Sequence, residues 1–305
     1  MYNIIMKKII VDKKNNGLKI SKIIYNSFPS MPKNTIYKLF RLKDIKVNGI
    51  RQKEDIIAFE NDVLEIYCSD SILLGLPTHI DYYYEDDNML VAYKPKGIEC
   101  HNPSSNSTYE YAVKQDKKDD NLNVCHRLDT NTEGLVIFTK NDIAHEEILK
   151  GFKNNSIHKN YITFVYGKMP KSHDVLEGYI IKNKEDGYSK IIDKNINGSS
   201  KVITEYSLLE YIPKLNVSIL DITLHTGKTH QIRAHMKYLN TPVIGDPKYS
   251  TNETNKKFGY KSQLLYAYKY AFDFDKYSIL NYLNNLIISI DKEIIINKFK
   301  SNHHI

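Results

Sequence analysis

The chain has 305 residues, of which 41% are hydrophobic, and it carries a formal net charge of +7. This length can bury the cores of one large and one small domain. No apolar run approaches the roughly 20 residues of a membrane-spanning helix, and Met1 to Lys8 lack the apolar stretch of a secretion signal. We therefore expect a cytoplasmic protein without a membrane partner. Its three cysteines form no CxxC pair, which suits reduced thiols.

Residues 1–70 show the pattern of a helix, helix, hairpin unit. Apolar side chains recur at helical spacing from Ile20 to Phe28 and, after a proline-containing break, from Ile36 to Phe40. A strand then enters the turn pair Asn48-Gly49, and a second apolar strand follows Asp62. The sequence thus predicts a small domain of two amphipathic helices and a β-hairpin.

Basic residues are concentrated between Pro32 and Lys53, where seven of them stand against one acidic residue, Asp44. The net charge alone supports RNA binding only weakly, because lysine is frequent throughout the chain. Clustering, however, is what a phosphate-facing surface requires. We therefore predict that this segment binds RNA; the alternative is that its charges only solvate a surface helix. The basic residues are Lys33, Lys38, Arg41, Lys43, Lys46, Arg51 and Lys53.

Periodicity weakens between Ser69 and Thr78, where glycine, proline and small polar residues indicate a linker. A second polar stretch, Asn102 to Asn123, is predicted to be a surface loop with some helix around Tyr109 to Val113. The chain is accordingly predicted to divide into a small domain, a linker and a large domain, at residues 1–70, 71–79 and 80–300.

Three polar segments of the large domain adjoin predicted strands. One strand ends in the turn Lys94-Pro95-Lys96-Gly97, and the strand Leu135 to Phe138 is preceded by a dense polar run that begins at His126. The third segment, Thr226 to His235, follows another strand and opens a helix. Polar groups gathered at strand ends indicate a functional site, although Asp129 taken alone would be interpreted as a turn residue that caps its neighbours.

These segments resemble the motifs of the RluA-type pseudouridine synthases. His-Arg-Leu-Asp followed by Thr-x-Gly-Leu is the hallmark of that family, and it stands at His126 to Leu135. Three further family motifs occur in the family's order, and the resemblance runs from Thr78 to Phe272. They are Lys-Pro-x-Gly at Lys94, Lys-x-Tyr…Val-x-Gly from Lys159 to Gly167, and Thr-Gly-x-Thr-His-Gln-Ile-Arg…Gly-Asp-x-x-Tyr from Thr226 to Tyr249.

Residues 1–70 are similar to a small RNA-binding module named after a small-subunit ribosomal protein, through Val47-Asn48-Gly49 and Asp62. The two resemblances imply an α+β fold. In that fold, a small helix-helix-hairpin RNA-binding domain precedes a catalytic domain with a bent, mainly antiparallel sheet and a central cleft. They also imply that the second helix and the hairpin face structured RNA.

The resemblance implies an enzyme that isomerises specific uridines to pseudouridine in structured RNA. Large-subunit ribosomal RNA is the favoured substrate and transfer RNA the alternative, with no protein partner implied. The reaction is redox-neutral and uses no group donor, so no cofactor is expected, and the chain has neither a Walker lysine loop nor a dinucleotide glycine motif. A competing hypothesis is a non-catalytic RNA-binding or ribosome-assembly protein on the same scaffold, which would bind RNA without isomerising it.

Pseudouridylation breaks the bond between ribose C1′ and uracil N1, turns the base and joins the ribose to C5. An ionised carboxylate is needed at the sugar, and family position assigns that role to Asp129. Whether it adds to the ribose, adds to the base or removes a sugar proton stays open. By the same resemblance, Arg233 is the cation that keeps Asp129 charged. Tyr161 stacks on the flipped uracil or assists proton transfer at C5, and Arg127 fills the space that the base leaves.

Two positions depart from the family pattern. Glu133 stands where most relatives have serine, and Lys228 replaces a common arginine, which keeps a cation but loses the bidentate geometry. We expect altered RNA contact, with Lys228 still binding RNA, and intact catalysis. His126 and His230 are interpreted as structural histidines because the chemistry leaves them no task.

The pairs Cys100-His101 and Cys125-His126 offer four nitrogen and sulfur ligands for zinc. Neither pair has the ligand spacing of a zinc finger or zinc ribbon, so no metal is expected. A nucleophilic pair of Cys125 and His126 is also disfavoured, because sequence neighbours on a strand point to opposite faces.

Overall fold

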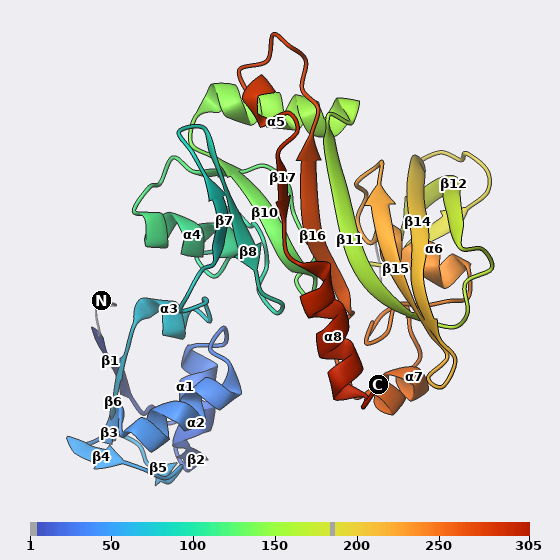
Figure 1. The fold of residues 1–305 in the computed structure, drawn as a ribbon. Coiled ribbons are helices and arrows are strands. Elements are labelled where there is room, and N and C mark those ends of the chain that lie inside the picture. Colours follow the sequence, from blue (N-terminus) through green and yellow to red (C-terminus); the bar gives the residue numbers. More distant parts are fainter. Residues whose placement is uncertain (1–4, 184–186) are drawn as a thin grey trace. The chain divides into compact units, whose positions relative to one another are not determined.

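The computed structural model describes residues 5–183 and 187–305. The segment Met1 to Lys8 was predicted not to be a secretion signal, and its residues 1–4 lie outside the described residues. The chain forms two compact units (Figure 1). One comprises the residues up to Ile80 together with His101–Asp119, and the other comprises Asp81–Cys100 and Asp120–Ile305. No helix in the described ranges is long and apolar enough to cross a membrane.

Two short helices lie in the predicted linker and in the predicted polar loop. Helix α3 (Asp70–Leu73) falls in the predicted linker. Helix α4 (Tyr109–Lys117) extends beyond the helical turn expected there, and its N-cap, Thr108, accepts the N–H of Tyr111. Because α4 belongs to the first unit, that unit takes in a segment that the predicted division assigns to the large domain. The division at residues 71–79 stays a prediction.

The first unit combines two amphipathic helices with a sheet. Helices α1 (Ile20–Ser27) and α2 (Lys33–Leu42) bury the apolar side chains that recur at helical spacing, which are Ile20, Ile23, Ile24, Ile36, Leu39 and Phe40. The four-stranded sheet has the order β1-β6-β3-β4, and β2 pairs with β5. The strands are β1 (Ile5–Ile10), β2 (Leu18–Lys19), β3 (Ile45–Val47), β4 (Ile50–Gln52), β5 (Ile57–Ala58) and β6 (Val63–Cys68).

The hairpin of β3 and β4 turns at Asn48-Gly49, where both residues have positive φ, 48° and 80°. Asn48 Oδ1 accepts the N–H of Val63 at 2.9 Å, and Asn48 Nδ2 donates to Asp62 Oδ1 at 2.8 Å. Hydrogen bonds therefore join the Val-Asn-Gly turn to Asp62 and to the first residue of β6. These contacts fix the hairpin on which Lys46 and Arg51 are paired across the two strands.

The second unit contains an 11-stranded sheet with the order β13-β12-β14-β15-β11-β16-β10-β8-β7, while β17 pairs with β16 and β9 with β10. The pairing of β10 with β16 is parallel and the other pairings are antiparallel. This confirms the expectation of a mixed fold with a large, mainly antiparallel sheet. The strands are β7 (Tyr82–Glu85), β8 (Met89–Lys94), β9 (Asn123–Val124), β10 (Glu133–Thr139), β11 (Ile157–Tyr166), β12 (His173–Lys182), β13 (Ser189–Ile192), β14 (Ser200–Ile212), β15 (Val217–Leu224), β16 (Leu265–Phe272) and β17 (Ile287–Ser289).

Two helices lie beside the central strands of this sheet (Figure 1). Their apolar side chains join hydrophobic cores with those strands. Helix α5 (Asp142–Asn154) adds Ile148 to a core with strand β10, and α8 (Lys292–Asn302) adds Phe299 to a core with Ile162 of β11. Because side chains alternate along a strand, β11 turns Tyr161 toward the opposite face, where a cavity lies. The other helices of the unit are α6 (Gln231–Tyr238), α7 (Asn252–Phe258) and the short η1 (Asn281–Leu283).

Candidate active site

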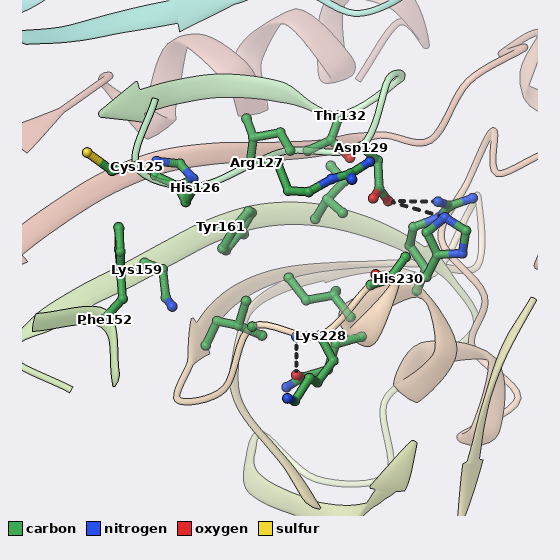
Figure 2. Close-up of a pocket in the computed structure, with 18 of the residues that line it drawn as sticks. Cys125, His126, Arg127, Asp129, Thr132, Phe152, Lys159, Tyr161, Lys228 and His230 are labelled. Carbon is green, nitrogen blue, oxygen red and sulfur yellow. Dashed lines mark hydrogen bonds and ion pairs between the residues drawn. The ribbon is translucent and has the colours of Figure 1, made fainter. Parts of the chain in front are cut away.

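A cavity of about 440 Å³ lies in the second unit, bounded by the loop between β9 and β10, strand β11 and the segment that leads into α6. Side chains from these separate segments point toward one another across it (Figure 2). The cavity brings together the catalytic and RNA-binding residues that were predicted in the large domain, which are Arg127, Asp129, Tyr161, Lys228 and Arg233.

Asp129 accepts a hydrogen bond from the buried Arg233, whose Nη1 lies 2.8 Å from Oδ2. The other edge of the guanidinium forms a bidentate pair with Asp246, at 2.6 Å through Nε and 2.9 Å through Nη2. Burial alone would lower the pKa of Arg233, but the Asp246 and Asp129 carboxylates outweigh burial and raise that pKa. The arginine stays charged and holds a fixed donor against Asp129.

Asp246 is a site residue that was not predicted from the sequence. Its side chain is fully buried, and Oδ1 also accepts the N–H groups of Lys248 and Tyr249, at 2.9 and 3.1 Å. The Gly-Asp-x-x-Tyr motif was the available signal. A motif does not specify which cation its aspartate meets, and only the fold brings Asp246 to Arg233.

The loop that carries Asp129 is held in place by the Lys-Pro-x-Gly turn. Lys94 is fully buried, and its Nζ donates to the carbonyl oxygens of Pro95, Ile98 and Thr130 at 2.9, 2.9 and 3.1 Å. The N–H of Gly97 also donates to the Thr130 carbonyl, at 2.8 Å. Burial lowers the pKa of Lys94 to about 8. This turn therefore fixes the backbone of the residue that follows Asp129.

Tyr161 is 7% exposed and lines the same cavity as Asp129. Burial, together with the negative charge of Asp129, raises the pKa of its phenol. The phenol therefore stays protonated at neutral pH, and the ring offers a flat apolar face inside the cavity. Arg127 and Lys228 also line the cavity but are exposed, so both cations are accessible from solvent.

His230, which was interpreted from the sequence as a structural histidine, lies beside the Asp129 carboxylate. Its Nε2 is 3.9 Å from Asp129 Oδ2, and its Nδ1 shares a hydrogen bond of 3.0 Å with the Tyr249 hydroxyl. Burial lowers the pKa of His230, while the Asp129 charge opposes that shift. The imidazole thus forms part of the wall beside Asp129.

His126, which was interpreted from the sequence as a structural histidine, binds the backbone. Its Nε2 accepts the N–H of Ile137 at 3.1 Å. Burial first, and the nearby Lys159 ammonium second, lower the pKa of His126 from 6.5 to about 3. In the unfolded chain this imidazole takes up a proton near pH 6.5, whereas in the folded chain it stays neutral until about pH 3. Its contribution to stability is therefore lost as the pH falls through this window.

The wild-type chain is expected to lose about 2 kcal/mol of unfolding free energy through His126 between pH 7 and pH 5. Urea unfolding at the two pH values measures the loss of unfolding free energy. In His126→Gln the total loss between pH 7 and pH 5 should be about 2 kcal/mol smaller than in wild type. His158, an exposed histidine of β11, supplies the control, because His158→Gln should keep the wild-type loss. An equal loss in His126→Gln and wild type would contradict the assignment.

Glu133 makes contacts on the first residues of β10 that a serine would not make. Its Oε2 accepts a hydrogen bond of 3.0 Å from the Tyr93 hydroxyl, and its Oε1 lies 3.8 Å from Lys96 Nζ. Glu133 is not among the residues that line the cavity. The contacts of Glu133 therefore lie outside the lining that contains Asp129.

The two cysteines considered for zinc are buried. Cys125 Sγ lies 3.7 Å from His145 Nδ1, so its histidine neighbour in space is not the one beside it in sequence. Burial raises the pKa of Cys125 to about 12, which makes this thiol a poor nucleophile at neutral pH. The described residues contain no cluster of three or more His, Cys, Asp or Glu side chains placed to hold a metal ion.

The predicted RNA-binding residues of the first unit differ in their freedom to contact RNA. Lys38, Arg41, Lys43 and Arg51 are exposed. Lys46 is partly buried, and its Nζ donates to the Tyr67 hydroxyl at 3.0 Å and lies 3.8 Å from Glu65 Oε2. Solvent therefore reaches four of the five side chains, although Arg51 Nη1 also donates to the Lys43 carbonyl at 2.8 Å. Lys46 is held by neighbours in its own sheet.

Comparisons with known proteins point to one family. The family model described as RNA pseudouridylate synthase matches residues 88–238. A protein of Mycoplasma capricolum named an uncharacterized RNA pseudouridine synthase is 30% identical over an alignment of 303 residues, and the match covers 93% of this chain and 97% of that protein. A ribosomal large subunit pseudouridine synthase C of Rickettsia felis is 30% identical over 253 residues, covering 77% of this chain and 82% of that protein.

A solved structure matches the fold of this chain. It is the human RNA pseudouridylate synthase domain containing 1, with a TM-score of 0.56 and 20% sequence identity. The match covers 73% of this chain and 95% of the human one. At this level of identity the likeness concerns the fold alone.

Proposed function

This chain belongs to the RluA-type RNA pseudouridine synthases and isomerises uridine in RNA, and we propose that large-subunit ribosomal RNA is its substrate and Asp129 its catalytic carboxylate. The name of the Rickettsia felis relative supports the choice of substrate. Family membership also sets aside the hypothesis of a non-catalytic assembly protein on the same scaffold.

The pairing of Asp129 with Arg233 is the observation that carries the proposal for the site. Each chemical route considered for the reaction starts from an ionised carboxylate beside the ribose. The Arg233 guanidinium places a positive charge 2.8 Å from Asp129 Oδ2, and this hydrogen bond fixes the direction in which the carboxylate oxygens point. Tyr161, a neutral ring in the same cavity, is then available to stack on the uracil and to assist proton transfer at C5.

The uridine must leave its helix to enter this cavity, and the exposed cations of the lining suit that step. Arg127 stands two residues before Asp129 on the same loop, so it can occupy the space that the base vacates as the base approaches the carboxylate. Lys228, on the segment before α6, adds a phosphate contact to the RNA on either side of the uridine.

Purified chain incubated with unmodified transcripts tests the substrate. Pseudouridine is expected in a large-subunit ribosomal RNA transcript at a defined position, and none in a pool of transfer RNA transcripts. Digestion to nucleosides and mass-coupled chromatography measure the product in each pool. Pseudouridine in the transfer RNA pool alone would overturn the choice of ribosomal RNA.

The exposed basic residues of the first unit should contribute to RNA affinity. Replacing Lys38, Arg41, Lys43 and Arg51 by Gln is expected to weaken binding and to flatten its salt dependence. The slope of log affinity against log salt should become shallower by about 0.7–0.9 for each phosphate that the variant no longer neutralises. Filter binding of the RNA fragment that the wild-type chain modifies, between low and moderate salt, measures both the affinity and the salt slope.

A control chain tests whether position matters or only net charge. Four exposed lysines of the same unit lie outside the basic segment, and their replacement by Gln should leave the slope close to wild type; they are Lys13, Lys14, Lys19 and Lys22. Equal effects of the two sets would remove the basic segment from the proposed RNA-binding surface.

A further inference from the structure

A buried ammonium group lines the cavity beside the proposed catalytic residues. Lys159 lies on β11 two residues before Tyr161, so both side chains leave the strand on the same face, about 7 Å apart along it. Lys159 is 8% exposed and lines the cavity with Asp129 and Tyr161. In Figure 2, Tyr161 lies between Lys159 and Asp129. The cavity thus has a carboxylate at one side and an ammonium at the other.

The positive charge of Lys159 is not compensated by the part of the protein that the structure describes. Among those residues, no carboxylate forms an ion pair with it, and its Nζ lies over the ring of Phe152, 4.8 Å from the centroid. Burial lowers the pKa of Lys159, and no anion opposes that shift. Arg233, by contrast, has two carboxylate partners in the same cavity. A buried cation without a counterion is costly unless an anion arrives with the ligand.

The surroundings of Nζ leave room for such an anion. A Cβ built on Gly227 would lie 3.6 Å from Lys159 Nζ, so the ammonium borders a glycine whose missing side chain keeps that side of the cavity open. Lys153 and Lys228 also line the cavity and are exposed. The positive potential that these cations create favours an anionic group over a neutral one at this end of the cavity.

Given that the substrate is RNA, as the proposed function has it, we propose that Lys159 binds a backbone phosphate next to the flipped uridine. The uracil and the ribose are neutral, and the flanking phosphates are the anions that the nucleotide brings into the cavity. A base stacked on Tyr161 with its ribose at Asp129 leaves the other side of the cavity to the phosphate. Lys159 would then fix the nucleotide along β11 while Asp129 acts on the sugar.

Phosphate replacement in the substrate tests this contact together with a lysine variant. The substrate is the shortest RNA fragment that the wild-type chain modifies, whichever RNA it comes from, so the test does not depend on the choice of ribosomal RNA. The phosphates 5′ and 3′ of the target uridine are replaced, one at a time, by neutral methylphosphonates. Single-turnover isomerisation and RNA affinity are measured for wild type and for Lys159→Met on each fragment.

One methylphosphonate is expected to reduce the efficiency of wild type by about 10- to 100-fold, the effect of removing one charge-assisted hydrogen bond. Lys159→Met should show a similar loss of efficiency on the natural fragment. The same methylphosphonate should then lower the efficiency of the variant by less than about threefold further. Lys159→Arg should retain most of the activity because it keeps the charge. Lys150→Met, which removes an exposed cation of α5 that does not line the cavity, should lose much less.

If Lys159 had a structural role, Lys159→Met would melt at a lower temperature than wild type. The proposal instead expects Lys159→Met to melt at the wild-type temperature or above it, because an unpaired buried charge has been removed. Losses that multiply for both methylphosphonates would overturn the proposal, because Lys159 would then be coupled to neither phosphate. A normal rate in Lys159→Met would overturn it as well. Failure of wild type to modify any RNA would instead count against the proposed function.

Discussion

Replacing Asp129 by Asn is expected to abolish pseudouridine formation while RNA binding stays close to wild type. The amide keeps the size of the side chain and an oxygen for the Arg233 Nη1–H donor, but it loses the charge and the nucleophilic or basic character that each route requires. Loss of a central catalytic group costs about 10,000-fold or more in rate. Single-turnover product formation and filter binding on the same RNA measure the two effects separately.

Glu133→Gln is the matched control for Asp129→Asn. It removes a carboxylate four positions along the same segment, from a side chain that bonds Tyr93 and does not line the cavity. Its rate should remain within a few-fold of wild type. Full activity in Asp129→Asn, or an equal loss in Glu133→Gln, would contradict the role assigned to Asp129.

Replacing Arg233 by Met is expected to affect folding and catalysis together. The guanidinium compensates two carboxylates, and one of them, Asp246, is fully buried. Removing one partner of a buried ion pair costs about 3–5 kcal/mol, because the remaining charge is left without compensation. Urea unfolding should therefore show a loss of this size, and pseudouridine formation should fall to background under conditions where the variant is still folded.

Two further variants separate the ion pair from general damage to α6. Lys237→Met, at an exposed position of the same helix, should change the unfolding free energy by less than about 0.5 kcal/mol. Asp246→Asn added to Arg233→Met should restore part of the lost stability, because it removes the stranded charge. An Arg233→Met chain that is as stable as wild type would contradict the geometry of the Asp129, Arg233 and Asp246 cluster.

Local patterns in the sequence predicted those parts of the fold that depend on local physics. The repeat from Ile20 to Phe40 predicted α1 and α2, because burial of one face of a helix fixes the spacing of its apolar residues. The turn pair Asn48-Gly49 predicted the hairpin for a similar reason, since both residues accept positive φ.

Contacts between distant segments were predicted only where the family resemblance supplied them. The resemblance pairs Asp129 with Arg233, and the structure places their side chains 2.8 Å apart. It did not identify Asp246, and the distribution of charge gave no indication that Lys46 is held by Glu65 or that Lys159 has no counterion among the described residues. Such features depend on which side chains the folded sheet brings together, and periodicity along the chain does not contain that information.

Pseudouridine mapping in cells tests most directly whether Asp129 acts on large-subunit ribosomal RNA. RNA is taken from a strain that lacks the gene and carries either no copy, the wild-type chain or Asp129→Asn, and carbodiimide-adduct stops are mapped by reverse transcription. The expected result is at least one stop in large-subunit ribosomal RNA that is lost with the gene, returns with wild type and stays absent with Asp129→Asn. A stop that Asp129→Asn restores, or a pattern that the deletion leaves unchanged, would contradict the assignment.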